Sequence, residues 1–113
     1  MEVKAKQKHI MISARKLRLV CNQVRGMDAQ QAMAVLEYMP QKGADIVGKT
    51  MASAVANAEN NFDLDREDLY VAGIWADEGP SLKRMKAGAR GRYKPRVRRT
   101  SHLTVVLAER EEE

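Results

Sequence analysis

Cysteine is nearly absent from this chain, and its absence limits the classes of protein to consider. Cys21 is the one cysteine among 113 residues, so a secreted scaffold held by internal disulfides is excluded. Apolar runs fall short of the ~20 residues that a membrane-spanning helix needs. The polar segment Met1 to Lys8 lacks the apolar region of a signal peptide. We therefore expect a cytosolic protein with no membrane partner.

Aromatic residues are scarce too, at 4% of the chain, so the core must be built mainly from aliphatic side chains. The length fits one domain spanning residues 1–113. Asp63, Asp65 and Glu67 alternate as in a calcium loop, but the glycine and final glutamate of that pattern are missing. The two histidines and the cysteine are not at zinc-site spacing. Ser101 and His102 point to opposite faces of a predicted strand, so they do not form a nucleophile–base pair. Together these observations lead us to expect no catalysis, no metal, no cofactor and no small-molecule substrate.

Acidic residues are missing from a long segment near the end of the chain. No Asp or Glu occurs from Gly79 to Ala108, while nine of the seventeen residues from Lys83 to Arg99 are Lys or Arg. Acidic residues gather instead between Asp63 and Glu78 and in residues 109–113, which we expect to form a flexible acidic tail. With a net charge of +5, this distribution favours a polyanionic partner such as nucleic acid.

Helical periodicity predicts three consecutive helices, over residues 15–25, 28–39 and 42–60. Ser13 is a candidate N-cap for the first helix, and Gly26 stops it. Asp28 is a candidate N-cap for the second helix, which Pro40 ends. Strands are predicted at 3–10, 69–76 and 100–108, in the order β-α-α-α-β-β. In the last strand Leu103, Val105 and Leu107 share one face.

The acid-free segment has the pattern of a long basic hairpin over about residues 79–100. Basic residues occupy every second position of its second arm: Arg90, Arg92, Lys94, Arg96 and Arg98. On a strand they lie on one face, and the first arm adds Lys83, Arg84 and Lys86. The glycines of the segment 87–91 suit a turn. A two-stranded hairpin is marginal in water, and its cations repel one another, so it needs a polyanion around it.

Several alternatives remain open from the residues alone. The basic run could be a solvated face or a disordered tail, and the stripe of Arg15, Arg18 and Arg25 could equally be a solvated helix face. Trp75 and Tyr70 are more consistent with core packing than with stacking on bases. A DNA-binding ribbon remains a rival, as does a module whose basic arm engages acidic proteins.

Five stretches carry a resemblance to a known family: 13–20, 25–26, 53–61, 77–84 and 98–106. The most specific are Asp77–Glu78–Gly79–Pro80–Ser81–Leu82–Lys83–Arg84 and Arg98–Arg99–Thr100–Ser101–His102–Leu103–Thr104–Val105–Val106. In order and spacing they resemble the bacterial family of large-ribosomal-subunit protein twenty-two, from Lys4 to Ala108. At the hairpin tip the chain departs from that family, with Ala87–Gly88 where Pro–Arg is common. Pro95 also differs, and it is expected at a bulge or an edge position.

The resemblance implies an α+β fold with three helices packed on a small three-stranded sheet and a long basic β-hairpin. It implies a structural constituent of the large subunit, ribosome-bound in the cytoplasm, that helps the subunit assemble beside neighbouring ribosomal proteins. The hairpin would bind ribosomal RNA, and its tip would meet the nascent peptide in the exit tunnel. The tip would be Ala87, Gly88, Ala89, Arg90 and Gly91. The residues expected to contact RNA are Lys83, Arg84, Lys86, Arg90, Arg92, Tyr93, Lys94, Arg96, Arg98 and Arg99, with a second surface of Arg15, Lys16, Arg18, Arg25, Lys4 and Lys8.

Overall fold

The computed structural model describes residues 2–87 and 93–110, and it describes side chains outside residues 82–97. Its elements are β1 (Glu2–Ile10), α1 (Ala14–Val24), α2 (Ala29–Tyr38), α3 (Gly43–Phe62), the short 3-10 helix η1 (Arg66–Asp68), β2 (Leu69–Glu78), β3 (Leu82–Ala87), β4 (Tyr93–Arg98) and β5 (Ser101–Glu109). The predicted order of elements is confirmed. Residues 88–92 of the predicted hairpin and 111–113 of the predicted acidic tail lie outside the described residues.

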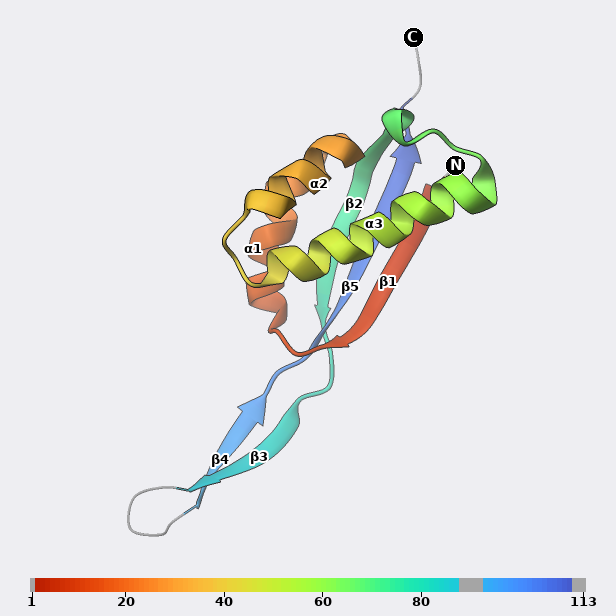
Figure 1. Cartoon of the computed structure of the whole chain (residues 1–113). Helices are drawn as coiled ribbons and strands as arrows, with labels where there is room; N and C mark the ends of the chain where they lie inside the picture. The colour runs from red at the N-terminus through yellow and green to blue at the C-terminus, as the bar shows by residue number, and fades with distance from the viewer. Residues whose placement is uncertain (1, 88–92, 111–113) are drawn as a thin grey trace.

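The main sheet is antiparallel, with β5 in the centre, β1 on one side and β2 on the other. The three helices lie together on one face of this sheet (Figure 1). Leu103, Val105 and Leu107 of β5 face the helices and are fully buried, as their alternation predicted. The predicted α+β class, with three helices packed on a small three-stranded sheet, is confirmed. Among the described residues no helix is both long and apolar enough to cross a membrane.

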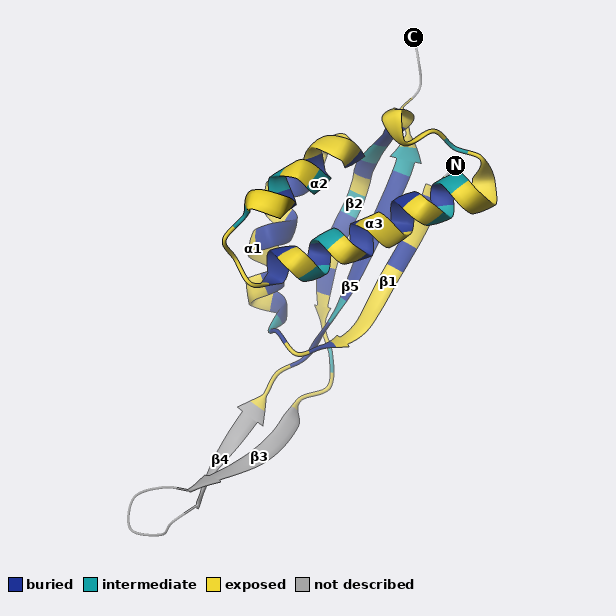
Figure 2. Ribbon diagram, in the orientation of Figure 1, coloured by how far each residue is buried: buried dark blue, intermediate teal, exposed yellow. Residues whose placement is uncertain are grey.

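The core lies between this face of the sheet and the inner sides of the helices (Figure 2). Leu17 and Val20 of α1 and Met51 of α3 are fully buried in it. Two small residues of α3, Ala54 and Ala58, are also fully buried. Their size allows the backbone of α3 to approach the sheet closely.

Cys21 lies in this core, and burial raises the pKa of its thiol to about 11. We expect the folded chain to react with a thiol reagent at pH 8 about a hundredfold more slowly than the urea-unfolded chain, because the thiolate is the reactive form. The time course of reagent absorbance, with and without urea, measures this ratio. Equal rates would contradict the buried position of the thiol.

The helix ends agree with the sequence at two positions and differ at a third. The Ser13 side chain accepts a hydrogen bond from the Lys16 backbone N–H at 3.4 Å, and Gly26 adopts the left-handed φ of 86° expected just past a helix end. Asp28 occupies the predicted N-cap position of α2, but the predicted cap by its side chain is wrong. Its side chain makes no cap hydrogen bond to α2, and its Oδ1 instead accepts one from Arg110 Nε at 2.6 Å.

The hairpin is a separate two-stranded sheet that leaves the domain at one end (Figure 1). The backbone of β3 pairs with β4 from Leu82 opposite Arg98 to Ala87 opposite Tyr93. This register shows no shift, so Pro95 lies in an edge strand rather than at a bulge. The second arm of the hairpin does not run on into β5 without a break, because β4 ends at Arg98 and β5 begins at Ser101. The reason lies on the opposite arm, where Pro80 has no N–H with which to continue the ladder.

Candidate nucleic-acid interface

The root of the hairpin is held in a fixed position against the sheet. The Gly79 N–H donates to the carbonyl of Thr100 at 2.9 Å, and the Thr100 hydroxyl donates to the carbonyl of Pro80 at 2.6 Å. Gly79 also allows a close approach, since a Cβ there would lie 2.7 Å from Thr100 Oγ1 and 3.2 Å from the His102 ring. These contacts set the direction in which β3 and β4 leave the domain.

A hollow of about 610 Å³ opens beside this root, between the loop after β1, the start of α1, the connection from α2 to α3, and the end of β4. Four cationic side chains line it: Lys16, Lys42, Arg98 and Arg99. The described residues that line it include no Asp or Glu. A concave surface with one sign of charge concentrates its field and attracts anions. We call this surface, defined by the four cations, the basic hollow.

The basic hollow also has apolar walls. Met11 is 43% exposed and Leu19 is 59% exposed, although both are large hydrophobic residues. Apolar faces beside cations match the chemistry of a nucleotide, which joins a flat base to a phosphate. Sequence reasoning missed Met11, Leu19 and Lys42 as site residues. Leu19 carried a signal, because it is apolar but falls outside the buried stripe of α1.

Arg15 lies beside the basic hollow rather than in it. It lines a second, smaller hollow of about 300 Å³ together with Arg99 and the carboxylate-bearing Glu78. Arg15 and Lys16 therefore come close to Arg99 from the start of α1, whose N-terminus adds a partial positive charge. The structure thus brings predicted residues of the helix surface next to predicted residues of the hairpin.

Arg18 and Arg25 have partners within the chain. Arg18 Nε donates to the carbonyl of Ala76 at 3.1 Å, and an Arg25 nitrogen donates to the carbonyl of Ile74 at 2.8 Å. Both carbonyls belong to β2, an edge strand. The two arginines therefore tie α1 to the edge of the sheet, a role that the sequence did not reveal. Both side chains remain exposed, so RNA contact through them stays a prediction.

The lysines of β1 form a separate surface. Lys4 is exposed and pairs across the sheet with Val106, away from the basic hollow. Lys8 lies where the register shifts between Gln7 and Ile10. At this irregularity His9 has a φ of 58°, and its N–H donates to Nδ1 of His102 at 3.1 Å.

Most of the predicted hairpin cations have side chains outside the described residues. These are Lys83, Arg84, Lys86, Arg90, Arg92, Lys94 and Arg96, together with Tyr93 and the tip positions Ala87, Gly88, Ala89, Arg90 and Gly91. The backbone register nevertheless places Arg84 opposite Arg96 and Lys86 opposite Lys94. Like charges at directly opposed positions destabilise a strand pair. An anion between the cations would remove that repulsion.

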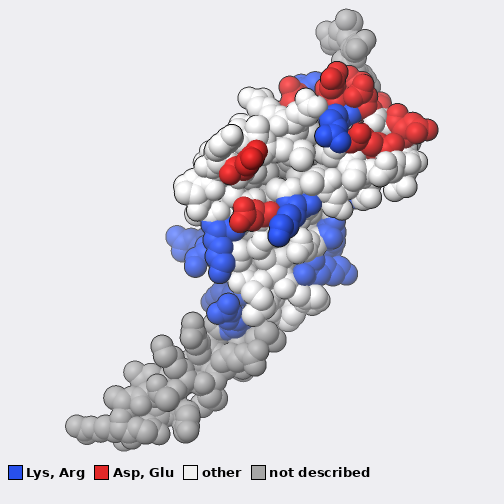
Figure 3. Space-filling model, viewed as in Figure 1, with Lys and Arg blue, Asp and Glu red and all other residues white. Residues whose placement is uncertain are grey.

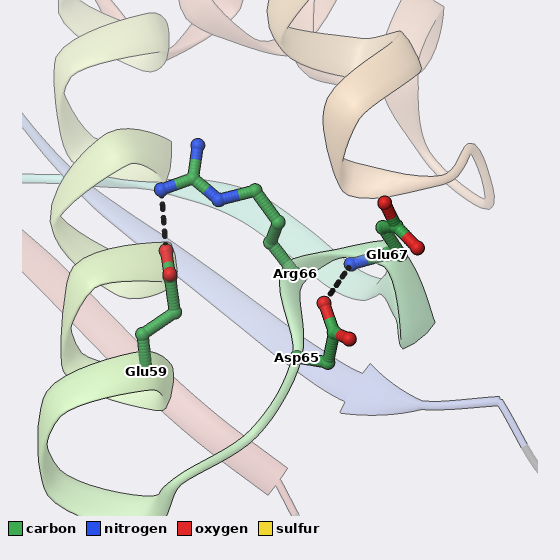
Figure 4. A network of polar contacts seen from close by, with 4 residues as sticks. All are labelled: Glu59, Asp65, Arg66 and Glu67. Atoms are coloured by element: carbon green, nitrogen blue, oxygen red, sulfur yellow. Dashed lines mark hydrogen bonds and ion pairs between the residues drawn. The ribbon is translucent and has the colours of Figure 1, made fainter.

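Acidic residues gather at the end of the domain away from the hairpin (Figure 3). There Glu59 of α3 forms an ion pair with Arg66, and the Asp65 carboxylate accepts from the Glu67 N–H at 3.1 Å (Figure 4). Of the alternating acids of this segment, Asp65 therefore caps the short helix η1. The molecule has an acidic end and, at the root of the hairpin, a basic one.

Comparisons with known proteins agree with this arrangement. The family model described as ribosomal protein L22p/L17e matches residues 5–108. Three relatives bear the description "Large ribosomal subunit protein uL22". The relative from Pediococcus pentosaceus is 48% identical over an alignment that covers 96% of this chain and 92% of the relative. The relative from Carboxydothermus hydrogenoformans is 48% identical, and the alignment covers 99% of both chains. The one from Chloroflexus aggregans is 49% identical with 97% of both covered. The chain therefore belongs to the ribosomal protein L22p/L17e family, whose members are structural components of the ribosome and not enzymes.

Proposed function

We propose that this chain binds large-subunit ribosomal RNA through its basic hairpin and the basic hollow at the hairpin root. It does so as a ribosome-bound component of the cytoplasm. The observation that carries the proposal is the meeting of Lys16, Lys42, Arg98 and Arg99 around one concave surface without a described carboxylate. The guanidinium group suits this task, because its fork donates two parallel hydrogen bonds to a phosphate.

The hairpin and the basic hollow form one binding surface in this proposal. Arg98 ends β4 and lines the basic hollow, so a strand of RNA following the hairpin arrives there without a gap. The register that opposes Arg84 to Arg96 favours the same partner, since phosphates on either side neutralise both cations. The acidic end lies away from this surface, so like charges do not repel the phosphates there (Figure 3).

The hairpin tip would reach further, to the wall of the nascent-peptide exit tunnel. Support comes from the family resemblance and from the direction of β3 and β4, which lead away from the compact domain (Figure 1). A rod that enters RNA while its domain stays outside touches segments far apart in the RNA. It would thereby help assembly of the large subunit, next to other ribosomal proteins and to the passing peptide.

Co-sedimentation tests the proposal. The tagged chain, expressed in its own host, should remain with the large subunit through a sucrose gradient in about 0.5–1 M monovalent salt, at which loose electrostatic binders dissociate. Release at that salt would contradict an integral position in the particle. Binding of the purified chain to deproteinised large-subunit RNA, with duplex DNA as competitor, then separates RNA recognition from general affinity for phosphate. Equal competition by the DNA would favour the rival reading of a DNA-binding ribbon.

A further inference from the structure

The second face of the main sheet carries a set of residues that the basic hollow does not use. Paired residues on neighbouring strands share a face, and the register places Lys6, Thr104 and Trp75 in one row across the three strands. The next row holds Lys4, Val106 and Gly73. This face lies opposite Leu103 and its neighbours, which face the helices.

Trp75 is the exposed aromatic residue of this face. Its side chain is 41% exposed, so the expectation that it packs in the core is wrong. The cause is an extra residue in β2, where the register shifts between Val71 and Gly73. Counting by twos from the buried Val71 would place Trp75 on the core side, and the inserted residue moves it to the other.

Gly73 allows the indole ring of Trp75 to approach the backbone of β2 closely. A Cβ at Gly73 would lie 3.0 Å from Cζ3 and 3.6 Å from Cε3 of Trp75. An edge of the ring therefore lies against Gly73, and a larger residue there would push the ring away. An indole ring that packs against the sheet and keeps part of its surface in solvent can stack on another flat ring.

The surroundings of Trp75 indicate which kind of ring it accepts. Tyr70, on the same face, already has the Arg110 guanidinium 4.9 Å from its ring centre, so its ring has a partner. Lys4 and Lys6 are both exposed on β1, in the rows of Gly73 and Trp75. Acidic residues of this face are Glu2 and Asp77, toward its two ends. The middle of the face thus combines one free aromatic ring with two cations.

We propose that Trp75 stacks on an unpaired base of RNA whose phosphate is held by Lys4 and Lys6. Neighbouring strands lie about 4.8 Å apart, so the backbones of Trp75 and Lys6 are on the order of 10 Å apart. The long lysine stem covers the distance between a stacked base and its own backbone phosphate. This site deepens the proposed function and rests on it, since it gives the RNA-binding domain a second contact surface. The domain then holds RNA on two sides.

The sequence offers a direct probe, because Trp75 is the one tryptophan of the chain. Titration of the full-length protein with deproteinised large-subunit RNA should quench its emission. The variant Trp75→Leu should bind this RNA about tenfold more weakly with an unchanged salt slope, because stacking releases no counterions. Trp75→Phe should recover most of the affinity. The control Tyr38→Leu removes an aromatic residue that is 84% exposed on α2 and should leave binding unchanged.

The outcomes separate this inference from the proposed function. Absence of RNA binding by the wild-type chain would overturn both. Normal binding by Trp75→Leu, with no change in the emission of the wild-type protein, would overturn the stacking site alone and leave this face to a protein neighbour. Weaker binding together with a lower salt slope for Trp75→Leu would also count against stacking. Thermal unfolding of each variant confirms that the fold is intact, as expected for a residue outside the core.

Discussion

The double substitution Arg98→Gln and Arg99→Gln should weaken binding to deproteinised large-subunit RNA by about 10²–10⁴-fold. Both side chains line the basic hollow, and each charge-assisted hydrogen bond to a phosphate is worth roughly 1.5–3 kcal/mol. The slope of log affinity against log salt should also fall by about two, since two fewer counterions are released. Filter binding at four or more salt concentrations measures both quantities.

A matched control separates the site from net charge. Lys49→Gln with Arg66→Gln removes the same number of charges from α3 and from the acidic end, where Arg66 pairs with Glu59. This control should keep the wild-type salt slope and lose little affinity. If both double variants lost the same slope, binding would depend on overall charge, and the basic hollow would have no special role.

Sequence patterns predicted the elements well, because each element depends on residues close together in the chain. The apolar stripes of the helices and the alternation of Leu103, Val105 and Leu107 are local signals, and so is the cap at Ser13. The error at Asp28 has a long-range cause. Its carboxylate accepts a hydrogen bond from Arg110, which lies 82 positions further along the chain and comes close to Asp28 only in the folded state.

The candidate site was only half visible in the sequence for the same reason. The alternating cations of the second arm indicated a nucleic-acid partner, and Lys16 was predicted as part of a separate second surface. The basic hollow, however, needs Lys42 from the connection before α3, which no local pattern links to the hairpin. Arg18 and Arg25 are the opposite case, because they form a basic stripe in the sequence but donate hydrogen bonds to the carbonyls of an edge strand within the chain. One extra residue in β2 was enough to move Trp75 to the other face.

Replacement of Gly79 by valine should destabilise the domain by about 2–4 kcal/mol and misdirect the hairpin. A Cβ would lie 2.7 Å from Thr100 Oγ1, which is closer than real Cβ contacts, so Thr100 or the backbone of the root must move. Crowding of this kind costs about 1–3 kcal/mol, and loss of the hydrogen bond from Thr100 to Pro80 adds roughly 1 kcal/mol. Urea denaturation followed by circular dichroism measures the change in the free energy of unfolding.

The second substitution Thr100→Ala shows whether this contact is the cause. Alone it should cost about 1 kcal/mol, because it removes the hydroxyl that donates to Pro80. Combined with Gly79→Val it should cost less than the sum of the two, since the atom nearest the new side chain is gone and the His102 ring, at 3.2 Å, is the next obstacle. Strict additivity would show that Gly79 and Thr100 act independently. The valine variant keeps every cation of the hairpin, so any defect in its entry into large subunits would come from a changed hairpin direction. A folded Gly79→Val chain that entered large subunits normally would show that the hairpin direction does not depend on the contacts at Gly79.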